Sequence, residues 1–324
     1  MKQTGRVVLI LLIGTLLVGG SRHLLQDQPL GTQPVAAMLV ASPVAPQEEQ
    51  GQPPMLLAAG DIANCVSPGA EATASLLRGR EGAIAALGAL AYRRGSPQEF
   101  ARCYDPTWGT EKARTRPAIG NHEYGTRNAA GYFAYFQSAA GPPEAGYYSY
   151  DLGSWHIIVL NSNCEEIGGC DAASPQAEWL RADLATHDAL CTLAYWHHPL
   201  FSSGTTHGGD EAMQPAWRLL YDAGADIVLS GHEHNYERFA PQDPDGTGDL
   251  QRGIRAFVVG TGGASHYPFG DPLPLSERRN ADTYGVLALS LLPQGYDWQF
   301  IPTPPPLDLP AAQPFADSGS GACH

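Results

Sequence analysis

Residues 227–234 read IVLSGHEH, an apolar run that ends in a glycine and a His-x-His pair. A short apolar run of this kind is typical of a buried β-strand. Residues two apart face the same side of an extended chain, so His232 and His234 would point the same way just past the end of the strand. A His-x-His pair alone is often a surface accident, but its position directly after an apolar run and a glycine favours metal binding.

Three earlier segments repeat this arrangement of an apolar run followed by polar residues. They are Gly60-Asp61 after residues 55–59, Gly120-Asn121-His122-Glu123 after residues 117–119, and His197-His198-Pro199 after residues 195–196. In α/β proteins the carboxyl ends of the strands deliver side chains to a common crevice. The four clusters together offer the oxygen and nitrogen donors that suit zinc, iron or manganese.

The pattern of the remaining chain predicts an α/β domain. Strands are expected at residues 55–59, 155–161, 192–196, 227–230, 256–260, 284–292 and 296–301, and helices at residues 71–77, 176–184 and 213–221. Helices interleave with the earlier strands, whereas the last strands follow one another without helices between them. We therefore expect layers of helix and sheet, with part of the sheet antiparallel.

The four clusters resemble the metal-binding blocks of the calcineurin-like metallophosphoesterase superfamily, and in particular its purple-acid-phosphatase-like branch. The resemblance extends over roughly residues 55–301. It implies a four-layer αββα fold, in which two packed mixed β-sheets are flanked by helices. It also implies two metal ions at the strand ends and the hydrolysis of phosphomonoesters by water that these metals activate.

The resemblance assigns roles to residues at matching positions. Asp61, Tyr92 and His234 would bind one metal, and Asn121, His197 and His232 the other; His122 would contact the substrate phosphate, and His207 would hold the phosphate or protonate the leaving group. Taken singly, Asp61 could be a turn or capping residue and Tyr92 a core aromatic. A solvated loop histidine is an equally good interpretation of His207. If Tyr92 binds as a phenolate, ferric iron is expected, and otherwise zinc or manganese.

The chain departs from the family pattern at Ala89. The family's second block is Gly-Asp-x-x-Tyr, and its aspartate bridges the two metals, whereas this chain reads Gly88-Ala89-Leu90-Ala91-Tyr92. A bridging carboxylate helps to hold two cations about 3.5–4 Å apart against their repulsion. The affinity of the dinuclear site for its metals is therefore expected to be lowered. One possible result is that only one of the two metals is well bound.

Three further histidines are expected to lie outside the set of ligands. Neighbours on a strand point in opposite directions, and the family position selects His197, so His198 is expected to support the site or to be structural. His156 and His187 are expected to be ordinary residues of a strand and of a helix end.

The charge of the chain excludes some partners. There are 33 Asp and Glu against 19 Lys and Arg, a formal net charge of −14. Such a chain repels polyanions, so broad nucleic-acid binding is not expected. A small phosphorylated substrate remains compatible, because a metal centre built from neutral imidazoles keeps a local positive charge.

Export is predicted from the first residues and from the cysteines. Lys2 and Arg6 precede an uncharged run to Gly20, which is typical of a secretory signal. The run is shorter than a membrane-spanning helix requires, so a cleaved signal is favoured and an uncleaved anchor is the alternative. An even number of cysteines in an exported chain favours disulfides. Among the possible pairings, we expect Cys164 with Cys170, Cys65 with Cys103, and Cys191 with Cys323.

The expected organisation is a signal peptide at residues 1–20, a flexible linker at 21–53, the metallophosphoesterase domain at 54–301 and a Pro-rich tail at 302–324 that Cys323 could tether. An exported phosphatase is the leading hypothesis. The first rival is a protein that binds metal and phosphate without hydrolysis, which Ala89 motivates. The second is a secreted structural domain without metal, which is supported only by the many Gly and Pro residues.

Overall fold

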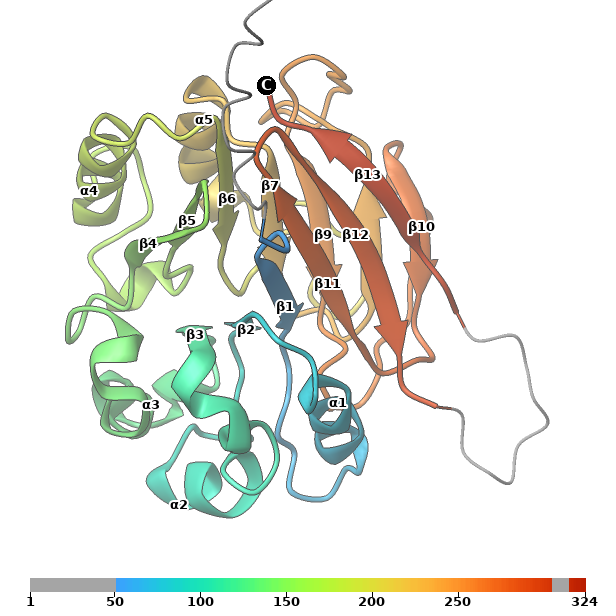
Figure 1. Cartoon of the computed structure of the whole chain (residues 1–324). Helices are drawn as coiled ribbons and strands as arrows, with labels where there is room; N and C mark the ends of the chain where they lie inside the picture. The colour runs from blue at the N-terminus through green and yellow to red at the C-terminus, as the bar shows by residue number, and fades with distance from the viewer. Residues whose placement is uncertain (1–50, 305–314) are drawn as a thin grey trace, which may run out of the picture. The chain divides into compact units, whose positions relative to one another are not determined.

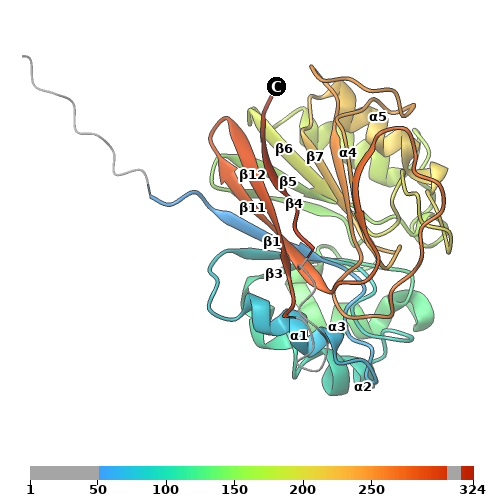
Figure 2. The same ribbon diagram turned by 90° about the vertical axis from the view of Figure 1, so that its right-hand side faces the viewer.

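The computed structural model describes residues 51–304 and 315–324. In these ranges two β-sheets pack face to face, and helices lie around them (Figure 1). Figure 2, turned by 90°, shows the helices α1 to α3 gathered at one end and α4 and α5 beside the second sheet. The expected fold of two packed mixed sheets flanked by helices is confirmed.

The first sheet has six strands in the spatial order β13-β12-β11-β1-β2-β3. Their bounds are β1 Met55–Ala59, β2 Ala83–Leu87, β3 Thr115–Ala118, β11 Gly285–Leu292, β12 Gly295–Pro302 and β13 Ser318–Ala322. The strands β1, β2 and β3 run parallel, whereas β11, β12 and β13 are antiparallel. The parallel half of the sheet therefore brings three carboxyl ends to the same edge.

The second sheet has seven strands in the order β10-β8-β9-β7-β6-β5-β4. Their bounds are β4 Tyr148–Leu152, β5 Trp155–Val159, β6 Cys191–Tyr195, β7 Ile227–Ser230, β8 Tyr236–Phe239, β9 Arg255–Val259 and β10 Ser276–Asn280. The four central strands β5, β6, β7 and β9 are parallel, and the outer pairings are antiparallel.

Five α-helices connect these strands. They are α1 Gly69–Leu77, α2 Pro97–Glu99, α3 Ala130–Phe136, α4 Pro175–Leu184 and α5 Gln214–Asp222. The start of α4 follows from its sequence, because the Ser174 hydroxyl accepts a hydrogen bond from the Ala177 N–H at 3.2 Å and Pro175 occupies the first turn. None of the helices in the described ranges is long and apolar enough to cross a membrane.

Alternating side chains divide the second sheet between two cores. In β5, Ile157 and Val159 lie in the core between the sheets, whereas Ile158 lies in the core that α4 and α5 cover. This is the two-residue period of a strand buried on both faces. The second core includes Trp217 and Leu220 of α5, so the helices close the outer face of this sheet.

The C-terminal segment contributes a strand that the Pro-rich composition did not predict. Strand β13 pairs with β12 over five residues, and Asp317 accepts hydrogen bonds from Arg238 Nε and from the Tyr236 hydroxyl, each at 2.7 Å. The disulfide Cys191–Cys323 ties this segment to β6. Cys65–Cys103 and Cys164–Cys170 are also paired, so all three expected disulfides are confirmed.

The predicted helices and strands match the structure to within a few residues at their ends. The strands β2, β3, β4, β8, β10 and β13 and the helices α2 and α3 were missed. The predicted signal peptide and most of the predicted linker lie outside the described residues.

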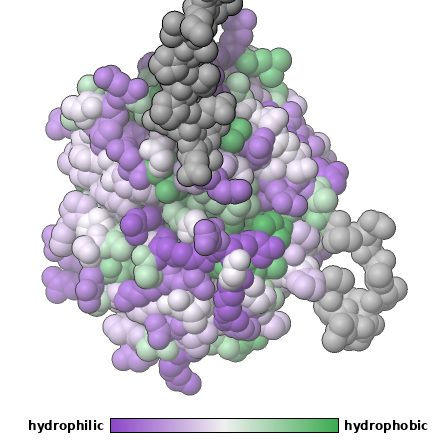
Figure 3. Space-filling view, viewed as in Figure 1, coloured by the Kyte–Doolittle hydropathy of each residue, from purple (hydrophilic) through white to green (hydrophobic). Residues whose placement is uncertain are grey.

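One surface hollow lies away from the polar clusters. Figure 3 shows an apolar area over β11 and β12 on an otherwise mostly hydrophilic face. Met55, Ala288 and Ile301 line a hollow of about 550 Å³ there, together with Gly82. Met55 and Gly82 lie at the starts of β1 and β2, so this hollow is at the amino ends of the parallel strands, away from the edge where α/β active sites form.

Candidate metal centre

The four polar clusters follow strands whose carboxyl ends meet. Asp61 follows β1, Ala89 follows β2 and Asn121 follows β3 in the first sheet. His197 follows β6, and His232 follows β7, in the second sheet. Because the sheets face one another, the carboxyl ends of these five strands meet at one edge of the domain, as the sequence predicts.

Asp61, Tyr92 and His234 form one cluster. The Tyr92 hydroxyl donates to Asp61 Oδ1 at 2.9 Å and lies 3.0 Å from His234 Nε2. His234 Nε2 is 3.3 Å from the same Asp61 oxygen. The three side chains are therefore mutual neighbours, and all three are buried. This is the set that the resemblance assigns to the first metal.

Asn121, His197 and His232 form the second cluster. His197 Nε2 is 3.0 Å from Asn121 Oδ1 and 3.2 Å from His232 Nδ1. Asp61 connects the two clusters, since its Oδ1 lies 4.0 Å from His197 Nε2 and its Oδ2 accepts the His232 backbone N–H at 2.8 Å.

Backbone carbonyls orient two of the histidines. His197 Nδ1 donates to the Leu87 carbonyl at 2.8 Å, and His234 Nδ1 donates to the Ser265 carbonyl at 2.5 Å. Both bonds leave Nε2 facing the centre of the cluster. Histidines that bind metals are characteristically held by a hydrogen bond of this kind from the other ring nitrogen.

The lowered pKa values of His197 and His232 suit metal binding, which requires neutral imidazoles. Burial, and then neighbouring imidazoles, lower the pKa of His197 well below its ordinary value and that of His232 to about 2. Burial acts in the same direction on His234, but the Asp61 carboxylate outweighs it and raises the pKa of this histidine. Burial and then Asp61 raise the pKa of Tyr92 well above its ordinary value, so without a cation Tyr92 is a neutral phenol.

The donor set fits transition-metal ions. Neutral imidazoles, one carboxylate, one amide oxygen and a phenol are ligands that iron, zinc and manganese accept. Glycines make room for the carboxylate: a Cβ on Gly231 would lie 2.7 Å from Asp61 Oδ2. A Cβ on Gly88 would lie 2.6 Å from His197 Nδ1, so neither position accepts a side chain without a shift of the ligands.

Ala89 lies in the wall of this centre. It is fully buried, its backbone φ is 50°, and its methyl group packs with Tyr92 and Ala264. Asp and Asn occupy this left-handed region several-fold more often than other non-glycine residues do. The backbone at position 89 therefore has a conformation that suits the aspartate of the family pattern better than it suits alanine.

Glu123 was not assigned a role from the sequence, and the structure gives it one. Its fully buried carboxylate accepts backbone N–H groups from Ala89 at 3.0 Å, Leu90 at 2.8 Å and Gly120 at 2.9 Å, with a longer one from Ala91. Burial raises the pKa of Glu123 to about 7, while these hydrogen bonds oppose the rise. Glu123 thus joins the segment of Ala89 to the segment that carries Asn121.

The two predicted substrate histidines lie at the edge of the centre. The His122 ring centroid is 4.2 Å from that of Tyr92, and its Nδ1 donates to the Arg93 carbonyl at 2.6 Å. The exposed His207 ring stacks on His232 with 4.1 Å between centroids. His207 is therefore brought to the site, although its loop is rich in glycine and serine.

Glu233 holds the loop that carries His207. Its buried Oε1 accepts the backbone N–H groups of His207 at 2.5 Å and Gly208 at 2.7 Å, while Oε2 has no hydrogen-bond partner. Glu233 was not predicted from the sequence to have a role. The feature that could have indicated one is a glutamate beside a histidine in both the GNHE and the GHEH blocks.

The expectation that His198 supports the site or is structural stays a prediction, but the alternation argument behind it does not hold. Ligand atoms of His197, His198 and His232 lie within 4.8 Å of one another. The alternation argument fails because β6 ends at Tyr195, so neither histidine lies on an extended strand. His198 Nδ1 is 2.8 Å from the Ser162 hydroxyl, which fixes the ring beside the second cluster.

His156 and His187 lie away from this centre, but they are not isolated. His156 is buried. Its Nε2 lies 2.7 Å from Asp183 Oδ2, and its Nδ1 lies 3.3 Å from Asp151 Oδ1. His187 stacks on it with 3.7 Å between ring centroids. These contacts join β4, β5 and the end of α4.

Comparisons with known proteins agree with this geometry. A family model for calcineurin-like phosphoesterases matches residues 43–236. Purple acid phosphatase 15 of Arabidopsis thaliana is 34% identical over 161 residues, which cover 42% of this chain and 29% of that protein. Purple acid phosphatase 21 of the same plant is 32% identical over 165 residues, which cover 44% of this chain and 37% of that protein. The matches thus span less than two fifths of these relatives.

A solved structure shares the fold. The structure of purple acid phosphatase PPD1 from yellow lupin (Lupinus luteus) seeds superposes with a TM-score of 0.66 at 19% identity, and the match covers 84% of this chain and 54% of that chain. The family model covers more than half of the chain, and the same strand ends carry the family's blocks. The chain therefore belongs to the calcineurin-like phosphoesterase family, and within it is similar to purple acid phosphatases.

Proposed function

We propose that this protein is an exported, metal-dependent phosphatase that hydrolyses phosphomonoesters, with a dinuclear site weakened at Ala89. The observation that carries the proposal is the meeting of six donor side chains in two adjoining clusters that share Asp61. Asp61, Tyr92 and His234 would hold one metal, and Asn121, His197 and His232 the other. The family implies a dinuclear metal site, while the metals and their occupancy are part of the proposal.

The protein's own groups bind and orient the ester. Bound metal ions would acidify a water and offset the charge that develops on the phosphoryl oxygens. His122 is held by the Arg93 carbonyl through Nδ1, so its Nε2 can donate to a phosphate oxygen when the ring is an imidazolium. His207 lies over His232 in an exposed loop and is placed to protonate the departing alcohol.

Export is supported by the chemistry of the cysteines. All six are paired in three disulfides, and disulfides persist in oxidising compartments. The first residues of the sequence, with their short apolar run, would direct the chain there.

Ala89 favours a second candidate function. A methyl group cannot bind a cation, so the remaining ligands could hold metal and phosphate without turning over an ester. Such a protein would bind phosphate or a phosphorylated ligand through the same histidines. The two candidates share a site and differ only in whether the bound ester is hydrolysed.

The deciding experiment measures turnover of an aryl phosphate by the mature protein and by Ala89→Asp. Each is loaded separately with iron, zinc and manganese, and metal content is measured in parallel. Turnover by both supports the enzyme, and the ratio of their rates gives the effect of the carboxylate. Turnover by Ala89→Asp alone supports the binding protein. If neither variant binds metal or turns over the ester, both candidates are refuted.

A further inference from the structure

A hollow of about 430 Å³ opens directly beside the second cluster of the metal centre. Asn121 and His198 form its inner wall, and Glu165, Glu166 and Asp210 contribute carboxylates to its lining. Glu165 and Glu166 are exposed, so their charges face solvent and whatever enters the hollow. The hollow is therefore continuous with the place where an ester would bind and has room for the group attached to the phosphate.

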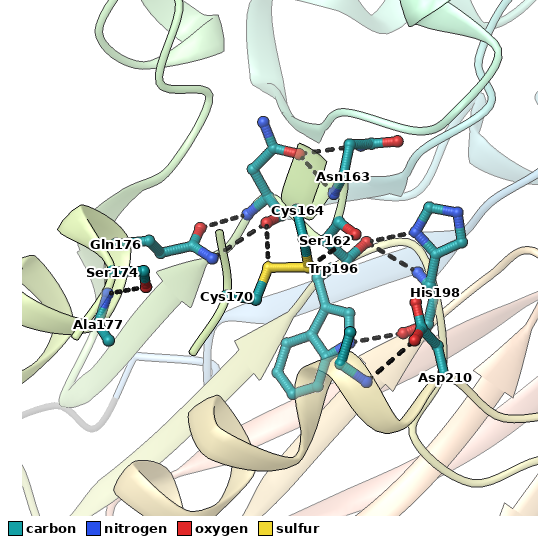
Figure 4. Close-up of a disulfide and its surroundings, with 12 residues drawn as sticks. Ser162, Asn163, Cys164, Cys170, Ser174, Gln176, Ala177, Trp196, His198 and Asp210 are labelled. Carbon is teal, nitrogen blue, oxygen red and sulfur yellow. Dashed lines mark hydrogen bonds between the residues drawn. A yellow bond between two sulfur atoms is a disulfide. The ribbon is translucent and has the colours of Figure 1, made fainter. Parts of the chain in front are cut away.

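The wall of this hollow is rigid. Figure 4 shows the disulfide Cys164–Cys170, which closes a short loop. Both glutamates lie in this loop of the sequence. Gln176 anchors the base of this loop, because it accepts the Asn161 N–H at 2.7 Å and donates to the Asn161 carbonyl at 3.0 Å. Ser162 binds His198, with its hydroxyl 2.8 Å from Nδ1 and accepting the backbone N–H at 3.0 Å. The backbone that carries the two glutamates is thus tied to the segments that surround the centre.

The charge of this side of the site has one sign. A smaller adjoining hollow of about 100 Å³ shares Tyr124 and Glu166 with the first and adds Glu144. Among the described residues, no Lys or Arg lines either hollow. The hollow on the side of Tyr92 and His122, by contrast, is lined by Arg93. Acidic side chains therefore gather on the side of the phosphate site that faces Glu165 and Glu166, and not on the side of Arg93.

We propose that the acidic hollow receives the leaving group and selects alcohols that carry a positive charge, such as aminoalkyl alcohols. This inference rests on the proposed function. Hydrolysis would consume one water, break the phosphate ester bond and release inorganic phosphate and the free amino alcohol. The metal centre attracts the phosphate end and the carboxylates attract the ammonium end, so a zwitterionic ester meets complementary charge at both ends. Anionic leaving groups and polyphosphates are repelled by the same carboxylates.

The test compares three small esters that differ in the charge of the leaving group. O-Phosphoethanolamine is cationic at that end, propyl phosphate is neutral, and phosphoglycolate is anionic. Because the alcohols differ in intrinsic reactivity, the informative quantity is the change in the ratio of kcat/KM values caused by Glu165→Gln/Glu166→Gln. The matched control is Glu178→Gln, which removes an exposed carboxylate on α4.

The double variant is expected to lower the preference for O-phosphoethanolamine over propyl phosphate about tenfold at low salt. In the wild type the same preference is expected to fall about threefold between about 20 and 300 mM added salt. Glu178→Gln should leave the preference as it is. A preference that the double variant does not change would overturn the inference, and so would a ratio of kcat/KM for phosphoglycolate over propyl phosphate that the double variant does not raise.

Failure of the proposed function is distinguishable from failure of this inference. If no ester, including the aryl phosphate, is turned over with any metal, the hydrolase proposal fails. The same three compounds are then compared by calorimetry as ligands of the metal-loaded protein. A ratio of Kd values that favours O-phosphoethanolamine and collapses in the double variant supports the inference, and equal Kd values overturn it.

Discussion

Removal of the Glu233 side chain is expected to destabilise the protein and to release the loop that carries His207. The carboxylate is fully buried, and its Oε1 accepts two backbone N–H groups at 2.5 and 2.7 Å. Hydrogen bonds to a charged acceptor contribute about 1.5–3 kcal/mol each. His207 is exposed and Gly208 half-buried, so we expect water to replace part of the loss. We therefore expect Glu233→Ala to lower the free energy of unfolding by about 3 kcal/mol.

Two other variants separate the parts of this effect. Glu233→Gln keeps a carbonyl oxygen at the position of Oε1 and puts the amide nitrogen at the position of Oε2, which has no hydrogen-bond partner. The free energy of unfolding should therefore fall by only about 1 kcal/mol. His207→Ala removes the ring but keeps both backbone bonds, and its stability should be within about 0.5 kcal/mol of the wild type. Urea unfolding followed by tryptophan fluorescence, with the disulfides intact, measures all three.

The same variants test whether Glu233 acts through His207. If it does, Glu233→Ala and His207→Ala should lower turnover of an alkyl phosphate by similar factors, and the double variant should be no slower than either. Multiplicative losses in the double variant would show that Glu233 affects the reaction by another route. A Glu233→Ala protein as stable as Glu233→Gln would refute the reasoning about the two hydrogen bonds.

Three further predictions concern ligands and pH. Asn121→Ala or His232→Ala should lower metal-dependent turnover by more than about a hundredfold with little loss of stability, and unchanged turnover would remove that residue from the ligand set. If ferric iron is bound through Tyr92, the loaded protein should absorb visible light and Tyr92→Phe should not, whereas a colourless iron-loaded wild type would exclude the phenolate ligand. Burial lowers the pKa of His156, but hydrogen bonds to Asp183 and then Asp151 outweigh burial and raise this pKa above its unfolded value. The protonated His156 therefore stabilises the fold below about pH 6.5, and this stabilisation is lost as the pH rises through the folded pKa. The melting temperature of His156→Gln should therefore differ more from that of the wild type at pH 6 than at pH 9, and an equal difference would contradict the assignment.

The candidate site could be predicted from the sequence because its signals are local. Each block consists of an apolar run and the polar residues directly after it, as in residues 227–234, so the ligands are read without knowledge of the fold. The partners of those ligands are not local. Glu233 accepts a hydrogen bond from His207, which is 26 positions away in the sequence. Nothing in the GHEH block indicates that this loop is its partner. The roles of Glu123 and Glu233 therefore depend on the fold.

Several of the missed strands lack the apolar pattern from which strands are predicted. The strands β4, β10 and β13 lie at or beside sheet edges, and the sequences of β10 and β13, SERRN and SGSGA, carry no apolar alternation. An edge strand needs backbone partners on one side only, so charged and small residues are tolerated there. Strand β3 contains Pro117, which fits an edge strand but argues against a strand in a sequence read alone. The Ala-rich β2 fits a buried helix as well as a strand.

The substitution at Ala89 changes the charge balance of the centre and leaves its framework intact. Glu123 still holds the Ala89 backbone, and the two clusters still meet through Asp61, the one carboxylate among the six candidate ligands. Two divalent ions would bring four positive charges to this single negative one, in a partly buried setting where repulsion is less screened than in water. A bound anion would then supply the charge that the bridging carboxylate supplies in the family, and it would be held more tightly for that reason. Tight retention of phosphate favours binding and slows its release, so under the proposed function a missing carboxylate would give either an impaired phosphatase or a phosphate-binding protein.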